Sequence, residues 1–183
     1  MSTKNQSAHP SAITKQCGFT LIELMVTLSI AGIIATIAVP AMGKMISNNR
    51  LTNQTNDLIS YINLARNEAI RRGKTVTLCK ANSTGSACLS SANWSDGWIL
   101  FEDNNDNSQL DAAAPENDTL LRREAGTDLS ISFTAPDSSA INALTFNSNG
   151  RPTTQTGDFK ISHSSDTRTI AISPTGRTSS TSP

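Results

Sequence analysis

The chain is poor in the residues that usually build catalytic and metal sites. Over 183 residues it holds two histidines, three cysteines and only 4% aromatic residues. Fifteen basic and fifteen acidic residues give a formal net charge of zero, so the whole chain has no bias toward nucleic acid or an anionic surface. Its length excludes a large multidomain enzyme. The 37% hydrophobic content is small for a large core unless the apolar residues are concentrated in one part of the chain.

Recognisable catalytic motifs are also missing. The sequence contains no Walker-type glycine loop, no paired-histidine metal motif and no dinucleotide fingerprint. His9 lies near the N-terminus, and His163 stands at the end of a predicted strand without a nucleophile arrangement around it. We therefore expect no enzymatic activity, no cofactor and no metal site, and we expect His163 to lie at the surface or in a hydrogen bond.

The apolar residues are concentrated in residues 19–39, where Glu23 is the single charged side chain. As a helix this segment would be about 31 Å long, close to the roughly 30 Å hydrocarbon core of a bilayer. The preceding segment carries Lys4 and Lys15 and no acid. By the positive-inside tendency, the N-terminus stays in the cytoplasm and the remainder is exported.

A cleaved secretory signal is the alternative interpretation of this segment. Small residues between positions 35 and 41 could form its cleavage site. Glu23 favours a retained helix, because a carboxylate in an apolar span costs roughly 2.5 to 3.5 kcal/mol on insertion scales, and a disposable signal has no use for it.

Residues 18–24, GFTLIEL, resemble the type IV prepilin signature, and Pro40 follows near the end of the apolar helix. The resemblance implies a leader over residues 1–18, removed by a prepilin peptidase that cuts after Gly18 and methylates Phe19. It also implies that Glu23 and Pro40 belong to the assembly helix. The Glu23 carboxylate would neutralise the N-terminal ammonium of a neighbouring subunit, since a buried charge needs a partner.

Residues 40–72 are predicted to continue the helix as an amphipathic segment. Apolar and small residues recur at alternating intervals of four and three, the spacing of one helical face: Leu51, Thr55, Leu58, Ile62, Ala65 and Ala69. Pro40 is expected only to kink the helix, and Gly73 to end it. A coiled coil is the weaker alternative, because only about three heptads are present.

Residues 73–183 are predicted to form a β-rich exported domain. Short β-branched or aromatic runs alternate with polar turns at 75–79, 98–102, 119–122, 129–133, 143–146, 159–162 and 168–173. The glycines of Asn149-Gly150 and of Pro174-Thr175-Gly176 mark tight turns. We predict an α+β fold in which the helix packs on antiparallel β-sheet, with residues 178–183 as a loose tail.

The cysteines are consistent with export. Cys17 belongs to the predicted leader, which leaves Cys79 and Cys88 as a candidate disulfide in the mature chain. A structural zinc site is the alternative, but two cysteines without a nearby histidine do not supply four ligands.

Within the pilin resemblance, several internal segments are similar to the GspH/FimT branch of minor pilins and pseudopilins. They are residues 67–72 (NEAIRR), 76–79 (VTLC) and 94–101 (WSDGWILF), together with Gly150-Arg151 and Gly176-Arg177. The resemblance implies a pilin-like fold and a structural subunit held in the inner membrane by one span, with its C-terminal domain in the periplasm. Its partners would be other pilin or pseudopilin subunits, in a type IV pilus, in its initiation or tip complex, or in a type II secretion pseudopilus.

A modest basic bias near the C-terminus raises the alternative of DNA binding. Arg151, Lys160, Arg168 and Arg177 are candidate contacts to the phosphates of double-stranded DNA. Some FimT-type minor pilins bind DNA during natural transformation through a C-terminal Gly-Arg-x-Arg motif, whereas this chain has Ser179 in place of the second arginine. Arginines flanking turns on a solvated surface are the simpler interpretation.

An acidic segment lies between Asp96 and Asp118, with seven acids and no Lys or Arg. Residues 103–107 (DNNDN) partly resemble the start of a calcium loop. The usual glycine and glutamate of such a loop are replaced by Ser108 and Ala114. A solvated hairpin loop is the simpler expectation, with weak calcium binding as the alternative.

Overall fold

The computed structural model describes residues 18–111, 113, 115, 117–136, 141–154 and 156–181. The predicted leader up to Cys17, and Ala114 of the acidic segment, lie outside the described residues. The chain forms two compact units, the first ending at Gly43 and the second beginning at Lys44. Each unit is described by itself below.

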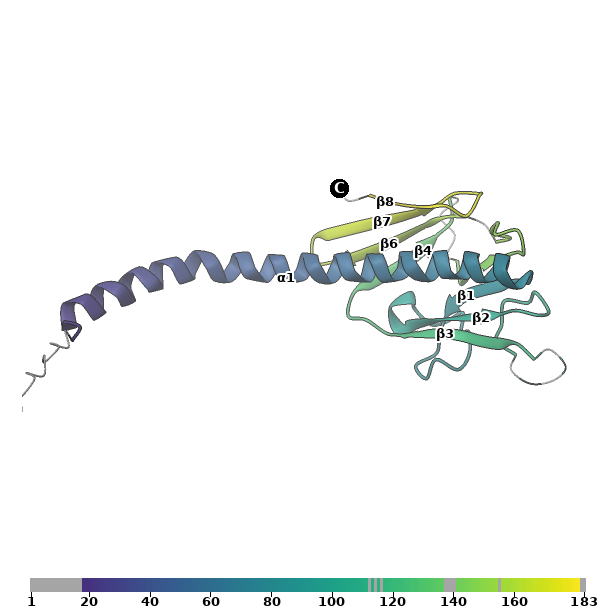
Figure 1. Ribbon diagram of the computed structural model, residues 1–183, viewed down its shortest axis with the longest axis horizontal. Helices are drawn as coiled ribbons and strands as arrows, with labels where there is room; N and C mark the ends of the chain where they lie inside the picture. Colours follow the sequence, from purple (N-terminus) through teal and green to yellow (C-terminus); the bar gives the residue numbers. More distant parts are fainter. Residues whose placement is uncertain are drawn as a thin grey trace, which may run out of the picture. The chain divides into compact units, whose positions relative to one another are not determined.

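One helix, α1 (Leu21–Arg72), contributes to both units (Figure 1). It begins after Thr20, whose Oγ1 accepts the N–H of Glu23 at 3.3 Å, the usual N-cap bond. It ends at Gly73, which has φ +66° and donates its N–H to the Ala69 carbonyl at 3.0 Å. Gly73 is therefore the stop that the sequence predicted, and the helix backbone continues through Pro40.

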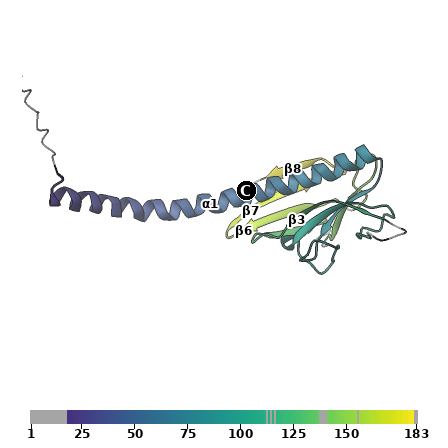
Figure 2. The same ribbon diagram turned by 60° about the horizontal axis from the view of Figure 1, so that its bottom comes forward.

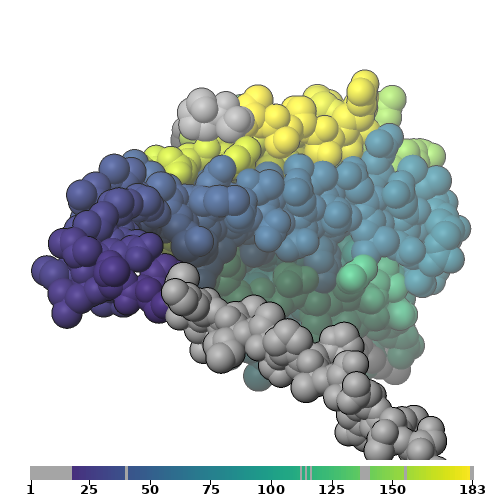
Figure 3. Space-filling view, turned by 60° about the vertical axis from the view of Figure 1, so that its left-hand side comes forward, coloured from purple at the N-terminus to yellow at the C-terminus, as the bar shows by residue number. Residues whose placement is uncertain are grey.

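In the second unit α1 presents one apolar stripe to the β-sheets. All six residues of the predicted stripe are buried, and Tyr61 is buried with them. Figures 1 and 2 show the part of α1 after Lys44 lying against the strands of both sheets. In Figure 3 its surface forms a band between the yellow C-terminal strands and the green strands. The amphipathic helix thus packs on its own domain, as expected.

Two antiparallel sheets make up the rest of the second unit. The first has the order β3-β2-β1-β5 and the second the order β4-β6-β7-β8. The strands are β1 (Val76–Lys80), β2 (Gly97–Glu102), β3 (Thr119–Ala125), β4 (Ser130–Thr134), β5 (Ala143–Phe146), β6 (Asp158–His163), β7 (Asp166–Ile172) and β8 (Thr178–Thr181), with a 3₁₀ turn, η1 (Trp94–Asp96). The seven predicted strands are present, with bounds shifted by up to three residues, and the α+β prediction is confirmed.

The predicted loose tail is wrong, because residues 178–181 form the edge strand β8. Gly176 donates its N–H to the Ser173 carbonyl at 2.8 Å, and Ser173 donates to the Arg177 carbonyl at 2.9 Å. This tight turn reverses the chain so that β8 pairs with β7. The strand is uncharged and built of Thr and Ser, so it carries no alternation of apolar and polar residues from which it could be predicted.

The main core lies between α1 and the two sheets. On the side of the second sheet, this core contains packed aromatic rings. Phe133 and Phe159 stack with their ring centroids 4.0 Å apart, and Trp94 packs edge-on against Phe159 with a centroid distance of 4.9 Å. A smaller cluster covers the opposite face of the first sheet, around Cys79, Cys88, Ile99 and Phe101. The Cys79–Cys88 disulfide lies in this second cluster and confirms the predicted pair.

Candidate functional site

The first unit presents an apolar helix surface that no described residue covers. Its apolar side chains are exposed, from Phe19, which is 85% exposed, to Met42. Among the described residues, α1 is the one helix long and apolar enough to cross a membrane. So large an apolar surface is stable in a bilayer or against other apolar helices rather than in water.

The predicted processing residues Gly18 and Phe19 and the predicted assembly residue Glu23 lie together at the start of this helix, whereas the other predicted assembly residue, Pro40, lies within it. Gly18 and Phe19 precede the helix, and Glu23 lies in its first turn. An acid is favoured in that turn because of the unsatisfied N–H groups there. Among the described residues, no basic side chain forms an ion pair with Glu23. Its charge therefore has no counter-ion within the described part of this chain.

The two Gly-Arg turns of the second unit lie against each other. Gly150 has φ +70° and Gly176 has φ +76°, conformations that favour glycine. A Cβ placed on Gly176 would come within 2.7 Å of the Gly150 carbonyl oxygen. The turns therefore meet although they are separated by two strands in the sequence, and they bring the backbone of Arg151 close to that of Arg177.

Arg66 of α1 holds these turns to the helix. Its Nε donates to the Gly150 carbonyl at 3.1 Å, and its Cδ would lie 3.4 Å from a Cβ on Gly176. The sequence placed Arg66 off the apolar stripe and gave no signal for this role, because its partner lies 84 positions away along the chain. The region thus contains three arginines: half-buried Arg66 and the exposed Arg151 and Arg177.

The other two candidate DNA contacts lie elsewhere in the domain. Lys160 alternates along β6 with the buried Phe159 and Ile161, so its exposed side chain lies on the outer face of the second sheet. Arg168 is paired with Ile161 in the ladder and lies on the inner face, where its Nη2 donates to Asn48 Oδ1 at 3.0 Å. The four residues therefore do not share one surface.

An ion-pair network connects Glu102, the last residue of β2, with the end of α1. Glu102, whose side chain is 7% exposed, pairs with Arg72 Nη1 at 3.0 Å and with Lys74. The hydrogen bond from Lys74, and then that from Arg72, hold the pKa of Glu102 below its usual value against the opposing effect of burial. This network ties the end of the helix to β2.

The acidic segment uses its carboxylates to bind its own backbone. Asp103, buried at the end of β2, accepts hydrogen bonds from Thr77 Oγ1 and Ser108 N, both at 2.9 Å, and from Asn107 N at 3.2 Å. Asp118 accepts from Asn104 N and Asp111 N, both at 2.9 Å. No group of three or more histidine, cysteine, aspartate or glutamate side chains placed to hold a metal ion occurs among the described residues. These two acids thus shape a loop, a role that resemblance to a calcium motif did not predict.

Tyr61 links α1 to the first sheet. Its Oη lies 2.8 Å from Glu124 Oε2 and 2.9 Å from the Arg123 carbonyl, and its ring packs edge-on against Trp98. Burial, reinforced by the hydrogen bond to Glu124, raises the pKa of Tyr61 to about 12.

His163 lies at a strand end, as expected. It is the last residue of β6 and is half-buried.

The fold and the exposed N-terminal helix together define a pilin-like protein, and sequence comparison agrees. The family described as "Type II transport protein GspH" matches residues 54–176, and the prokaryotic N-terminal methylation motif matches residues 13–39. The chain belongs to the GspH family. This is a family of structural pilins and pseudopilins rather than enzymes.

Two curated pilins are similar to part of the chain. The type IV major alpha-pilin of Moraxella bovis is 42% identical over 69 residues, 38% of this chain and 43% of that pilin. Fimbrial protein Q of the same organism is 44% identical over 66 residues, 36% and 41% of the two chains. The matches thus span less than half of these relatives.

Solved structures show the same fold. The type IV minor pilin FimU of Pseudomonas aeruginosa superposes in two crystal forms with TM-scores of 0.52 and 0.53, at 18% and 19% identity. The superpositions cover 72% and 74% of this chain and 96% and 94% of FimU. At this level of identity the likeness concerns the fold.

Proposed function

We propose that this protein is a minor structural subunit of a type IV pilus or a type II secretion pseudopilus. A prepilin peptidase cleaves it after Gly18 and methylates Phe19. Before assembly, the mature chain is anchored in the inner membrane with its second unit in the periplasm. The observation that carries the proposal is the exposed apolar stretch of α1 before Lys44, which begins three positions after Gly18 and contains one acid, Glu23, without an ion pair among the described residues.

Glu23 is the residue of the membrane helix to which we assign a role in filament assembly. A membrane span needs no carboxylate, and an unpaired one opposes insertion. Cleavage after Gly18 would create an ammonium on Phe19, and packing of the helices in a filament would bring the ammonium of one subunit to the carboxylate of another. Removing the carboxylate would then leave that ammonium buried without a counter-ion, which is strongly unfavourable.

The decisive experiment compares Glu23→Gln with Glu68→Gln, which removes an acid from the periplasmic part of the same helix. We expect Glu23→Gln to be inserted and cleaved but to be absent from sheared filaments, and Glu68→Gln to be incorporated. Gly18→Val should leave the precursor uncleaved. Normal cleavage of Gly18→Val, or normal incorporation of Glu23→Gln, would overturn the proposal.

The phenotype of a gene deletion distinguishes a type IV pilus subunit from a subunit of a secretion pseudopilus. Deleting the gene should abolish surface pili and twitching if the subunit belongs to a type IV pilus. It should instead leave exported enzymes in the periplasm if the subunit belongs to a secretion pseudopilus.

A DNA-binding minor pilin is the second candidate function. The contact between the two Gly-Arg turns supports it, because it brings Arg151 and Arg177 close to Arg66, and several arginines in one place suit a phosphate backbone. The absence of a second arginine at Ser179 argues for weak binding. Lys160 and Arg168 are not part of this surface.

The test titrates fragment 47–183 with double-stranded DNA at several salt concentrations. If DNA is a ligand, Arg151→Ala/Arg177→Ala should weaken binding and flatten its salt dependence, while Lys160→Ala should change it little. Equal binding by all three proteins, or none at low salt, would remove this candidate and leave the structural subunit.

A further inference from the structure

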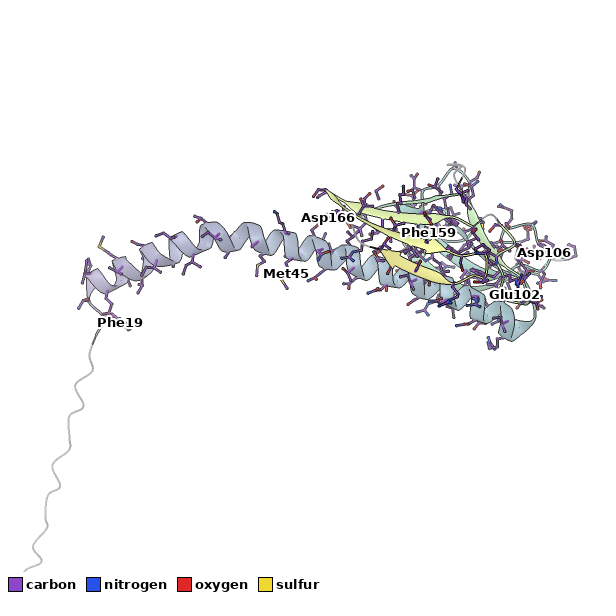
Figure 4. All side chains as sticks on the ribbon, turned by 90° about the horizontal axis from the view of Figure 1, so that it is seen from above. Phe19, Met45, Glu102, Asp106, Phe159 and Asp166 are labelled. Atoms are coloured by element: carbon purple, nitrogen blue, oxygen red, sulfur yellow. A yellow bond between two sulfur atoms is a disulfide. The ribbon has the colours of Figure 1, made fainter. Side chains whose placement is uncertain are left out.

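A groove runs between α1 and the β6–β7 hairpin within the second unit. It has a volume of about 580 Å³ and is lined on the helix side by Lys44, Met45, Asn48 and Leu51, and on the strand side by residues 166–168. Figure 4 shows Met45 and Asp166 at the same end of this unit. Nothing in the proposed assembly or in DNA binding uses this groove.

Arg168 reaches the groove with part of its hydrogen-bonding capacity unused. Its Nη2 is held by Asn48 Oδ1 at 3.0 Å. Its Nε is buried and has no hydrogen-bond partner among the described residues. Because this Nε is closed to solvent, a ligand in the groove would meet the guanidinium through its Nη groups, which can donate more hydrogen bonds than the one to Asn48.

The three charged groups of the groove are not paired with one another. No carboxylate of a described residue lies within ion-pair distance of Lys44 or Arg168, and Asp166 pairs with no basic side chain of the described part. Two cations and one carboxylate therefore face the same space. Their natural complement is a ligand carrying a phosphate beside an ammonium group.

The position of Lys44 along α1 indicates where such a ligand would come from. Lys44 follows Val39, the last residue of the apolar run, by only five positions in the sequence, and five residues of helix span about 7.5 Å. The polar layer of a bilayer extends roughly 5 to 7 Å beyond the hydrocarbon on each side. A subunit inserted as proposed above thus holds Lys44 at the level of the lipid phosphates on its exported side.

We propose that this groove binds the headgroup of a phospholipid bearing a primary ammonium, such as phosphatidylethanolamine. The phosphate lies between Lys44 and Arg168, the ammonium meets Asp166, and the exposed Met45 provides apolar contact near the glycerol. The site would hold the periplasmic domain at the membrane surface before assembly. The proposal rests on membrane insertion of the subunit and is independent of its incorporation into a filament.

The experiment uses the full chain in maltoside micelles with equal amounts of phosphatidylethanolamine and phosphatidylglycerol, and counts retained lipids by native mass spectrometry. We expect the unmodified protein to retain phosphatidylethanolamine preferentially. Lys44→Gln and Arg168→Gln should each reduce retention of both lipids about fivefold. Asp166→Asn should reverse the preference toward phosphatidylglycerol, because it removes only the partner of the ammonium.

Matched controls come from the outer face of the same sheet. Lys160→Gln and Asp158→Asn make the same charge changes away from the groove and should retain lipid as the unmodified protein does. Glu23→Gln should also leave lipid preference unchanged, which separates this site from filament assembly. Should Arg168→Gln misfold by circular dichroism, the exposed Lys44 and Asp166 variants still carry the test.

Three outcomes would overturn the proposal. One is equal retention of the two lipids that Asp166→Asn does not alter. Another is an equal loss of lipid in Lys44→Gln and in Lys160→Gln, which would show a general charge effect. The third is saturation by water-soluble phosphoethanolamine at lower concentration than by the lipid, which would make the ligand a free headgroup rather than a membrane.

Discussion

Gly176 lies so close to Gly150 that a Cβ on Gly176 would come within 2.7 Å of the Gly150 carbonyl oxygen. That oxygen also accepts the hydrogen bond from Arg66. A single point therefore joins the helix, the turn after β5 and the turn between β7 and β8. Disturbing it should affect the packing of both sheets on the helix.

Gly176→Ala should destabilise the domain by about 2 to 4 kcal/mol, because it adds a clash with backbone to a left-handed conformation. Gly73→Ala is the matched control, with a similar φ of +66° but open space around its Cβ, and should cost only about 1 kcal/mol. Urea unfolding of fragment 47–183, which retains the whole core, measures both. Equal losses would mean that the contact between the turns contributes nothing.

Removing the Cys79–Cys88 disulfide should lower the free energy of unfolding by roughly 2 to 3 kcal/mol, from the chain entropy of so short a loop. The double variant Cys79→Ser/Cys88→Ser avoids leaving a free thiol. Its far-UV circular dichroism should be unchanged under native conditions, because the main core lies on the other face of the first sheet. Loss of the folded state would show that the smaller cluster is essential to the domain.

Tyr61 is the single tyrosine of the chain, so its ionisation can be followed by phenolate absorbance without interference. The titration should be centred near its pKa of about 12. Because this value lies above the roughly 10 of an unfolded chain, the neutral phenol stabilises the fold below pH 10. That contribution is lost as the pH rises through 12.

Glu124→Gln should lower the Tyr61 pKa but leave it above 10, since burial is the first cause of the shift and the hydrogen bond to Glu124 the second. Asp128→Asn, which removes an exposed acid that pairs with Arg50, should leave the titration midpoint unchanged. A midpoint near 10 in the unmodified protein would contradict the buried position of the phenol.

Glu102→Gln should destabilise the domain at pH 7 by about 2 kcal/mol, the usual value of hydrogen bonds to a charged group. The depressed pKa of Glu102 gives a stabilisation that is present above the carboxyl's unfolded value and is lost as the pH falls through its folded value. The difference between the variant and the unmodified protein should therefore shrink at pH 3. Urea midpoints at the two pH values measure it, with Asp106→Asn in the exposed loop as the control.

Much of this architecture follows from sequence patterns alone. The α1 stripe from Leu51 to Ala69 has helical spacing, and the strands around Phe101, Phe146 and Phe159 have β-branched or aromatic runs, so burial could be predicted from periodicity. The disulfide followed from the number of cysteines and from export. These features depend on neighbours in sequence or on composition, which the chain displays directly.

The remaining features depend on contacts between distant segments. Strand β8 has only Thr and Ser, and its existence depends on the turn at Gly176. Arg66 reaches Gly150, and Asp103 reaches Thr77, across separations that periodicity does not encode. The four candidate DNA contacts do not form one surface for the same reason. Strand pairing, which the sequence does not display, places Lys160 and Arg168 on opposite faces of one sheet.

The buried residues of the described core begin at Leu51, whereas the apolar side chains from Phe19 to Ile46 stay exposed. Among the described residues, no side chain of the first unit contributes to the hydrophobic core. The N-terminal segment can therefore exchange one apolar solvent for another, lipid tails for the helices of neighbouring subunits, while the domain it carries remains folded. Extraction of the helix from the bilayer is then a transfer between two similar apolar environments. Pairing of the Glu23 carboxylate can decide the direction of that transfer.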